Sequence, residues 1–167
     1  MTIVSFATAD LCDQFETEIR AERLRILMPM FRSYGGRPAF SGAITTLKLF
    51  EDNSFVRKAL EQAGEGRVLV VDAGGSLRRA VLGDQLAALG TRNGWSGVLV
   101  YGCIRDSAAI AGMDIGVLAL ATHPQKTDKK NQGEADIPVS FAGATLHPGE
   151  WLYADADGIL VAPSPLT

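Results

Sequence analysis

Apolar positions in this chain occur in short runs that predict β-strands. Three continuous runs lie between glycines or polar residues, and each predicts a strand buried on both faces. These runs are Arg67–Asp72, Gly97–Tyr101 and Ile115–Ala121. Apolar and polar residues alternate over 39–50, which predicts a strand with one buried face. Residues 137–146 and 151–162 are predicted as strands joined by the turn His147-Pro148-Gly149-Glu150.

Helix patterns separate these strands. Helices are predicted over 8–20, from Asp52-Asn53-Ser54 to about Ala63, from Gly83 to Asn93-Gly94, and over 106–112. Thr8 or Asp10 is the expected cap of the first helix. Residues 21–38 and the polar stretch His123–Asp136 are predicted as loops, and we expect the second to be mobile or packed on a neighbouring subunit.

The order of these elements predicts an α/β domain with layers and a mixed sheet. Strand–helix–strand units in the middle of the chain require right-handed crossovers and parallel pairing. The flanking strands are expected to pair antiparallel. The length of 167 residues fits a single domain over 1–167.

Composition and charge exclude several classes of protein. The net charge of −3 gives no basic face for phosphates, so nucleic acid is not an expected partner. No apolar run approaches the roughly 20 residues of a membrane span. The N-terminal stretch lacks the pattern of a signal peptide, which favours a cytoplasmic location. Cys12 and Cys103 are expected to be free thiols.

Charged residues follow two of the predicted strands. Gly83-Asp84 comes after the segment Ser76–Leu82, and Arg105-Asp106 comes after the strand that ends near Tyr101. Ligands collect at the carboxyl ends of parallel strands, so we expect both pairs on one rim of the sheet. The free N–H groups of Gly83, Asp84, Gln85 and Leu86 would open a helix and attract an anion.

These residue types suit a 2-oxo acid bound beside a divalent metal ion. Arg105 can hold a carboxylate or keto oxygen with paired donors. Asp106 is a hard oxygen ligand suited to Mg²⁺ or Mn²⁺, and Asp84 could bind a water on that metal. A simpler interpretation stays open: Asp84 as a carboxylate favoured by the helix dipole, and Arg105-Asp106 as a surface ion pair.

Other polar residues carry weaker signals. His123 and His147 lack the spacing of a zinc site and are expected on the surface. Asp155 and Asp157 are expected in a hairpin turn. The basic run of Lys126, Lys129 and Lys130 is expected to form a solvated loop. Trp95 and Tyr101 are expected to pack in the core.

Several segments together resemble the RraA-like family, which contains class II 4-hydroxy-4-methyl-2-oxoglutarate aldolases and the regulator of ribonuclease E activity. The segments are TADLCD, SYGGRPAFSG, LFEDN, GRVLVVDAGGSLRRA, NGWSGVLVYGCIRD, MDIGVLAL and GEWLYADADGILV. The aldolase motif of the family is an Asp, twenty residues, then Arg-Asp. Asp84 and Arg105-Asp106 have this spacing.

The resemblance implies a swivelling β/β/α fold assembled as a homotrimer or a dimer of trimers, with sites near subunit interfaces. It implies that Arg105 binds the keto acid and steadies the pyruvate enolate. It also implies that Asp106 ligates the metal, that Gly83–Leu86 cradle the carboxylate, and that Asp84 orients a water involved in proton transfer. The implied reaction is retro-aldol cleavage to two pyruvates, with oxaloacetate decarboxylation as a side activity.

The sequence differs from the aldolases, or from the regulator branch, in three places. Well-studied aldolases carry a longer C-terminal region that supplies acidic residues to the neighbouring site, whereas this sequence ends at Thr167. Residues 19–26 resemble a small insertion. The regulator branch typically lacks the Asp after the Arg, whereas Asp106 is present here. Catalysis is therefore the first hypothesis, and a non-catalytic inhibitor of ribonuclease E is the alternative.

Overall fold

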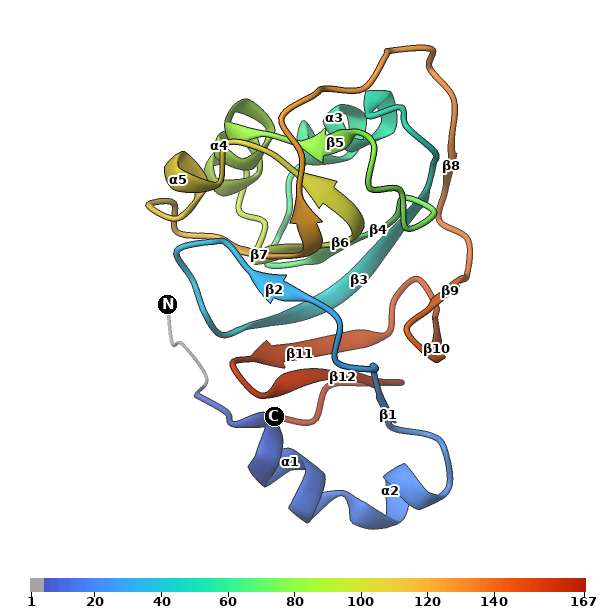
Figure 1. The fold of residues 1–167 in the computed structure, drawn as a ribbon. Coiled ribbons are helices and arrows are strands. Elements are labelled where there is room, and N and C mark those ends of the chain that lie inside the picture. The colour runs from blue at the N-terminus through green and yellow to red at the C-terminus, as the bar shows by residue number, and fades with distance from the viewer. Residues whose placement is uncertain (1–4) are drawn as a thin grey trace.

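A computed structural model describes residues 5–167 of the chain. Most of its strands belong to one mixed sheet of 10 strands, with the order β1-β12-β11-β3-β4-β6-β7-β2 (Figure 1). The long strand β3 (Phe40–Lys48) connects two differently paired parts of this sheet. Its first part pairs antiparallel with β11 (Trp151–Asp155), and its second part pairs parallel with β4 (Val68–Asp72). The sheet therefore has an antiparallel half and a parallel half joined by one strand.

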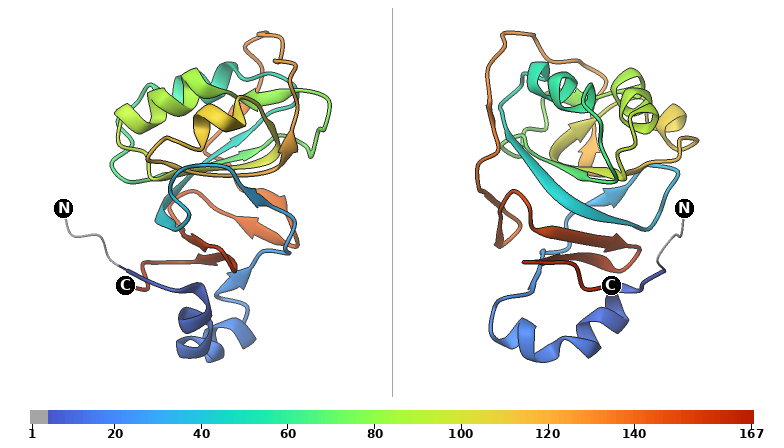
Figure 2. Two further views of the ribbon diagram at one scale, coloured as in Figure 1. Left: turned by 60° about the vertical axis from the view of Figure 1, so that its left-hand side comes forward. Right: turned by 180° about the vertical axis from the view of Figure 1, so that it is seen from behind.

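The two halves lie one above the other, with helices on the outer face of the parallel half (Figure 2). The parallel half continues through β6 (Gly97–Ile104) and β7 (Gly116–Thr122). Helices α3 (Ser54–Leu60), α4 (Asp84–Arg92) and α5 (Ser107–Ile110) cover it. This arrangement confirms the predicted layered β/β/α architecture with a mixed sheet.

Apolar side chains fill the spaces between these layers. Leu69 and Val71 of β4 pack under the helices, whereas Val68 and Val70 of the same strand face the antiparallel half. The strand is buried at every position, as its continuous apolar run predicts. Trp95 lies in the helix-side core as expected, while Tyr101 is only half-buried. Cys12 and Cys103 are both free, as predicted.

The structure corrects several predicted elements near the ends of the chain. Residues 137–146 form a hairpin of β9 (Val139–Phe141) and β10 (Ala144–Leu146) instead of one strand. Ala142 and Gly143 turn the chain with positive φ angles of 50° and 77°, the geometry of a type I′ turn. Residues 151–162 likewise form β11 and β12 (Gly158–Ala162), paired as a hairpin with Asp157 in its turn.

The two predicted loops contain short strands. Within 21–38, β1 (Arg25–Ile26) pairs with β12 and β2 (Arg32–Ser33) pairs with β7. Between β7 and β9, β8 (Glu134–Ala135) pairs with β3. Outside these loops, another short strand, β5 (Ala80–Leu82), pairs with the part of β6 that extends beyond the end of β4. Short pairings of this kind leave no periodic pattern, so sequence analysis missed them.

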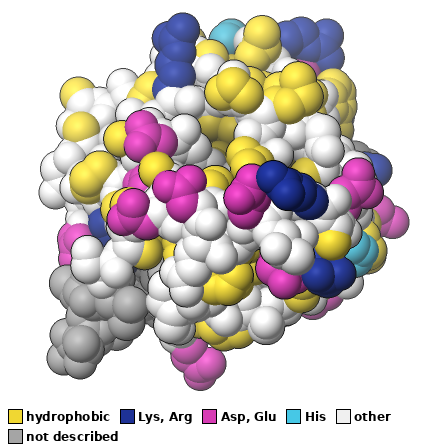
Figure 3. Space-filling view, turned by 90° about the horizontal axis from the view of Figure 1, so that it is seen from below, with side chains coloured by type: hydrophobic (Ala, Val, Ile, Leu, Met, Phe, Trp, Pro, Cys, Tyr) yellow, Lys and Arg dark blue, Asp and Glu magenta, His cyan; other side chains and the backbone are white. Residues whose placement is uncertain are grey.

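The predicted helix over 8–20 is divided at Phe15 into α1 (Thr8–Gln14) and α2 (Glu16–Arg20). The cap comes neither from Thr8 nor from Asp10. Asp155 instead accepts hydrogen bonds from the backbone N–H and the hydroxyl of Thr8, at 2.7 and 2.6 Å. Figure 3 views the molecule from the side of these helices, and acidic side chains gather across the middle of that face. Such a face does not suit nucleic acid.

The buried carboxylate of Asp52 helps to hold the segment between β7 and β8 against the body of the domain. Asp52 is 1% exposed, and its Oδ2 accepts the backbone N–H groups of Lys130 and Gln132. Its Oδ1 accepts two bonds from Ser54 at the start of α3. Burial by itself raises the pKa of Asp52, but these hydrogen bonds outweigh burial and the pKa lies below its usual value. The expectation of a mobile loop does not hold around Lys130 and Gln132.

We expect Asp52→Asn to destabilise the fold by about 3 kcal/mol at pH 7, because an amide places N–H donors against donors in a buried site. Since the folded pKa is depressed, the carboxylate stabilises the protein above about pH 4 and this stabilisation is lost as the pH falls through the folded pKa. Urea unfolding at pH 7 and at lower pH measures both effects. Asp128→Asn, on the exposed part of the same segment, is the control and should change stability by less than about 0.5 kcal/mol.

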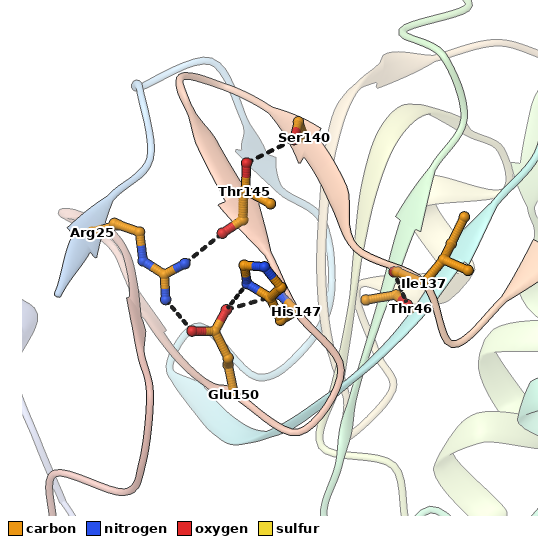
Figure 4. Close-up of polar contacts among 7 residues, drawn as sticks. All are labelled: Arg25, Thr46, Ile137, Ser140, Thr145, His147 and Glu150. Atoms are coloured by element: carbon orange, nitrogen blue, oxygen red, sulfur yellow. Dashed lines mark hydrogen bonds and ion pairs between the residues drawn. The ribbon is translucent and has the colours of Figure 1, made fainter. Parts of the chain in front are cut away.

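A second polar cluster fixes the β9–β10 hairpin to the rest of the antiparallel half (Figure 4). The Arg25 guanidinium pairs with the Glu150 carboxylate and donates to the carbonyl of Thr145. Glu150 also accepts the backbone N–H of His147 at 2.8 Å. Burial raises the pKa of Glu150, but the bonds from Arg25 and His147 more than compensate and lower it. His147 therefore lies in a turn, as predicted, and contacts a structural ion pair.

Candidate active site

The carboxyl ends of β5, β6 and β7 form one rim of the parallel half. Leu82 pairs with Ile104, and Ile104 pairs with Thr122, so the three strands end in register. The Arg105 backbone N–H then donates to the Leu82 carbonyl at 2.9 Å. This register places Gly83 and Arg105 side by side, as the sequence predicts for charged residues that follow neighbouring strands.

Asp106 turns away from β6 and directs its carboxylate to the start of α4. Its backbone is left-handed, with φ 57° and ψ 38°, a conformation that Asp and Asn tolerate better than most residues. Oδ2 of Asp106 accepts the backbone N–H of Asp84 at 3.0 Å. The carboxylate thus satisfies one of the free donors at the helix N-terminus. The structure therefore brings Asp84 and Asp106 together.

Gly83 leaves room for this contact. A Cβ atom on Gly83 would lie 2.8 Å from Oδ2 of Asp106 and 3.4 Å from Nε of Arg105. The backbone of Gly83 is extended, with φ −128° and ψ −170°, so any residue could adopt it. The requirement for glycine is therefore set by the site and not by the backbone.

Gly83→Ala should leave the fold intact and disable the site, because the new methyl group must displace the Asp106 carboxylate, which lies 2.8 Å from the added Cβ. A displacement of this size should lower turnover by about a hundredfold. Thermal unfolding and the pyruvate release that the family resemblance implies, measured on the same sample, separate the two effects. Gly158→Ala is the matched control, because a Cβ there meets nothing within 4 Å. Equal activity of the two variants would contradict the prediction.

Arg105 offers a cation at the rim. Its side chain is 38% exposed, and its Nε lies 3.9 Å from Oδ2 of Asp106, a long ion pair. Among residues 5–167, no hydrogen bond engages its guanidinium group. A half-exposed guanidinium with free paired donors is suited to a carboxylate or a keto oxygen.

The other predicted residues of the helix start lie where expected. Oδ1 of Asp84 accepts the backbone N–H of Gln85 at 2.8 Å. Leu86 has its side chain in the core, so only its backbone can serve a ligand. Within the described part of the chain, the N–H groups of Gly83 and Leu86 have no acceptor. The rim thus combines backbone donors, one guanidinium group and two carboxylates.

The carboxylates fit a hard divalent cation that keeps most of its water. Across residues 5–167, no group of three or more His, Cys, Asp and Glu side chains could hold a metal ion. This observation argues against a site in which the protein supplies most of the ligands, such as structural zinc. Mg²⁺ and Mn²⁺ sites need only one or two protein carboxylates. Asp106, 39% exposed on its side chain, could bind the cation, and Asp84 lies next to it.

His123, which the sequence predicted only as a surface residue, also lies at the rim. The backbone N–H of His123 donates to the carbonyl of Ile104 at 2.9 Å, so His123 directly follows the end of β7 beside Arg105. Nδ1 of His123 accepts the N–H of Gln125. The signal was present in the sequence, since His123 follows a buried strand just as Arg105 does.

Fold and site together define a β/β/α domain with backbone donors, a guanidinium group and two carboxylates at the rim of its parallel half. The profile of the family described as RraA-like, Aldolase/RraA, matches residues 8–161. A protein of Dechloromonas aromatica is 58% identical over 98% of this chain and 100% of its own length, and it is named "Putative 4-hydroxy-4-methyl-2-oxoglutarate aldolase". The chain therefore belongs to the RraA-like family.

Two solved structures share this fold closely, both with a TM-score of 0.91. One is described as S-adenosylmethionine:2-dimethylmenaquinone methyltransferase from Geobacillus kaustophilus, is 48% identical, and aligns over 96% of this chain and 97% of its own. The other is described as the RNA-processing inhibitor RraA from Thermus thermophilis, is 43% identical, and aligns over 98% and 96%. The names of these relatives describe different activities, so the reaction has to be inferred from the residues of the site.

Proposed function

We propose that this protein is a divalent-metal-dependent class II aldolase that cleaves 4-hydroxy-4-methyl-2-oxoglutarate to two molecules of pyruvate. The observation that carries the proposal is the meeting of Asp106 with the N-terminus of α4 beside Arg105. The 58% identity to a relative with an aldolase name supports it. Oxaloacetate decarboxylation is proposed as a side activity, since it produces the same pyruvate enolate.

Each group at the rim has a separate role in the proposed retro-aldol cleavage. The bond between C3 and C4 of the substrate breaks as the C4 hydroxyl loses its proton, and C3 then gains a proton. The N–H groups of Gly83–Leu86 bind the carboxylate next to the keto group. The Arg105 guanidinium faces the keto oxygen, where negative charge develops. Asp84 orients the water that carries protons.

Asp106 is the proposed ligand of the cation. A divalent metal ion at this position supplies Lewis-acid stabilisation of the negative charge on the keto oxygen. The chain itself contributes an oxygen ligand, a second acidic group nearby and a half-exposed position that solvent can reach. Mg²⁺ and Mn²⁺ are the expected ions because the protein offers few ligands.

A pyruvate-release assay tests the proposal. The protein is stripped with EDTA and assayed on 4-hydroxy-4-methyl-2-oxoglutarate and oxaloacetate, without metal and with added Mg²⁺, Mn²⁺ or Ca²⁺. We expect release only with added Mg²⁺ or Mn²⁺. Full activity in the presence of EDTA, or no release from either substrate with any metal, would overturn the proposal.

A second function is favoured by the 43% identity and the 0.91 TM-score to an inhibitor of RNA processing. The chain would then bind ribonuclease E and slow RNA cleavage without chemistry of its own. An RNA cleavage assay with micromolar protein separates the two functions. The acidic face over α1 and α2 fits a protein partner better than RNA.

We also infer that the chain assembles as a homotrimer or a dimer of trimers. Three apolar side chains of the segment around β1 are exposed, namely Ile26, Met28 and Met30. Exposed apolar groups close together often mark a subunit interface. Light scattering coupled to gel filtration gives the mass directly, and a monomer at micromolar concentration would contradict the inference. For cellular location, the structure shows only that no helix within residues 5–167 is long and apolar enough to cross a membrane.

A further inference from the structure

A cavity lies away from the rim site, on the face of the parallel half that is turned away from the helices. Its volume is about 570 Å³, within the range of ligand sites. Lys48 and Asp72, the last residues of β3 and β4, line it together with Tyr101 of β6, and the three residues pair in register. The segment with β8, which runs beside β3 in Figure 1, adds Glu134.

The charged groups around this cavity do not neutralise each other. Lys48 pairs in register with Asp72 on one side and with Glu134 on the other. Opposite charges on neighbouring strands normally form cross-strand pairs. In the part of the chain that the structure describes, Lys48 nevertheless forms an ion pair with neither carboxylate. The ammonium group and the two carboxylates instead surround the same space.

Asp72 is the most informative of these groups, because it is only 7% exposed. Val68 and Val70 of β4 face the antiparallel half, so the alternation of the strand directs Asp72 to the same face. One oxygen accepts the backbone N–H of Gly74 at 2.9 Å. The other has no hydrogen-bond partner among the described residues. This oxygen is accessible from the cavity, so it can accept a hydrogen bond from a ligand there or from water.

The remaining walls are aromatic and polar. Phe50 is 58% exposed, and a Cβ on Gly74 would lie only 2.8 Å from its ring, so one face of the ring covers Gly74. Tyr101 is stacked on Phe141, with ring centroids 5.0 Å apart. The cavity thus offers an apolar surface next to separated positive and negative charges.

We propose that this cavity binds an α-amino acid with an apolar side chain. The ammonium group of the ligand would face Asp72 and Glu134, its carboxylate would face Lys48, and its side chain would cover Phe50. A zwitterion satisfies both signs of charge at once, whereas a ligand with a single charge would pair either with Lys48 or with the two carboxylates. The cavity is lined by none of the residues of the rim site, so this binding does not depend on the proposed aldolase reaction.

Calorimetry with L-phenylalanine, L-leucine, 3-phenylpropionate and phenethylamine tests the proposal on the metal-free full chain. We expect the two amino acids to bind with a Kd of about 1 mM or tighter, and each analogue that lacks one charge to bind at least about tenfold more weakly. Equal binding of 3-phenylpropionate and L-phenylalanine, or no binding of either amino acid at about ten times that concentration, would overturn it.

Two substitutions assign the binding to this cavity. Lys48→Met and Asp72→Asn should each weaken L-phenylalanine binding at least about tenfold. Asn keeps an oxygen for the Gly74 N–H, and Lys48 is exposed, so both variants should fold. Lys129→Met removes an exposed lysine outside the cavity and should bind as the unmodified protein does. Unchanged binding in Lys48→Met would place the ligand elsewhere and reject the site.

Discussion

Arg105→Ala should lower kcat/KM for 4-hydroxy-4-methyl-2-oxoglutarate by about 10²- to 10³-fold, a loss of roughly 3–4 kcal/mol of transition-state stabilisation. The guanidinium group is half-exposed at the rim, and no hydrogen bond within the described residues engages it. Its donors are therefore available for the oxygen on which charge develops. Since the backbone N–H of Arg105, and not its side chain, bonds to Leu82, the variant should keep its fold.

The size of the loss should depend on donor geometry as well as charge. Arg105→Lys keeps the charge but loses the paired donors, so it should recover only part of the activity. Arg20→Ala removes an exposed arginine from the last turn of α2, away from the rim, and should change kcat/KM by less than about twofold. Unfolding midpoints of all three variants exclude general damage. If Arg20→Ala lost as much activity as Arg105→Ala, the assigned role of Arg105 would be wrong.

Asp106 substitutions should change metal binding and anion binding in opposite directions. The carboxylate accepts the Asp84 N–H, which is also a proposed donor to the substrate carboxylate. Without metal, Asp106 therefore competes with the substrate for this donor. In EDTA, Asp106→Gly should bind pyruvate about tenfold more tightly than the unmodified protein. Its affinity for Mn²⁺ should fall by about a hundredfold or more, and turnover should be lost with it.

Asp106→Asn removes the negative charge but keeps an oxygen that can accept the backbone N–H of Asp84. Its amide oxygen can still accept the Asp84 N–H, so metal-free pyruvate binding should stay close to that of the unmodified protein, while Mn²⁺ binding is weakened. Both Asn and Gly suit the left-handed backbone at this position, whereas Ala would add strain of about 1 kcal/mol. Equal pyruvate affinity of the Gly and Asn variants in EDTA would refute the competition while leaving the aldolase assay to judge the reaction.

The rim could be predicted because two local signals agree there. Buried strands are visible as apolar runs, and a charged residue that directly follows such a run must lie at the end of the strand. Asp84, Arg105 and Asp106 satisfy this rule, and the structure brings them together. The roles of these residues remain predictions. His123 and Asp72 also lie at the ends of buried strands, so the same rule predicts both as candidate ligand-binding residues.

Other features depend on contacts between distant segments, which no local pattern records. Asp52 looks like a cap residue in the sequence, and only the fold shows that it also binds the backbone of Lys130 and Gln132. The β9–β10 hairpin was missed because its turn begins with Ala142, a residue that rarely adopts positive φ. Similarly, the cap of α1 comes from Asp155, near the other end of the chain.

The position of β3 between the antiparallel and parallel halves of the sheet has a consequence for biosynthesis. Phe40 to Ala43 pair only with β11, whose residues leave the ribosome more than a hundred positions later. At ordinary rates of translation this delay is on the order of ten seconds. During that time the start of β3 has an unpaired edge with buried-type side chains, which is a site for aggregation or chaperone binding. The nascent chain should therefore need its last hairpin before it becomes resistant to proteases.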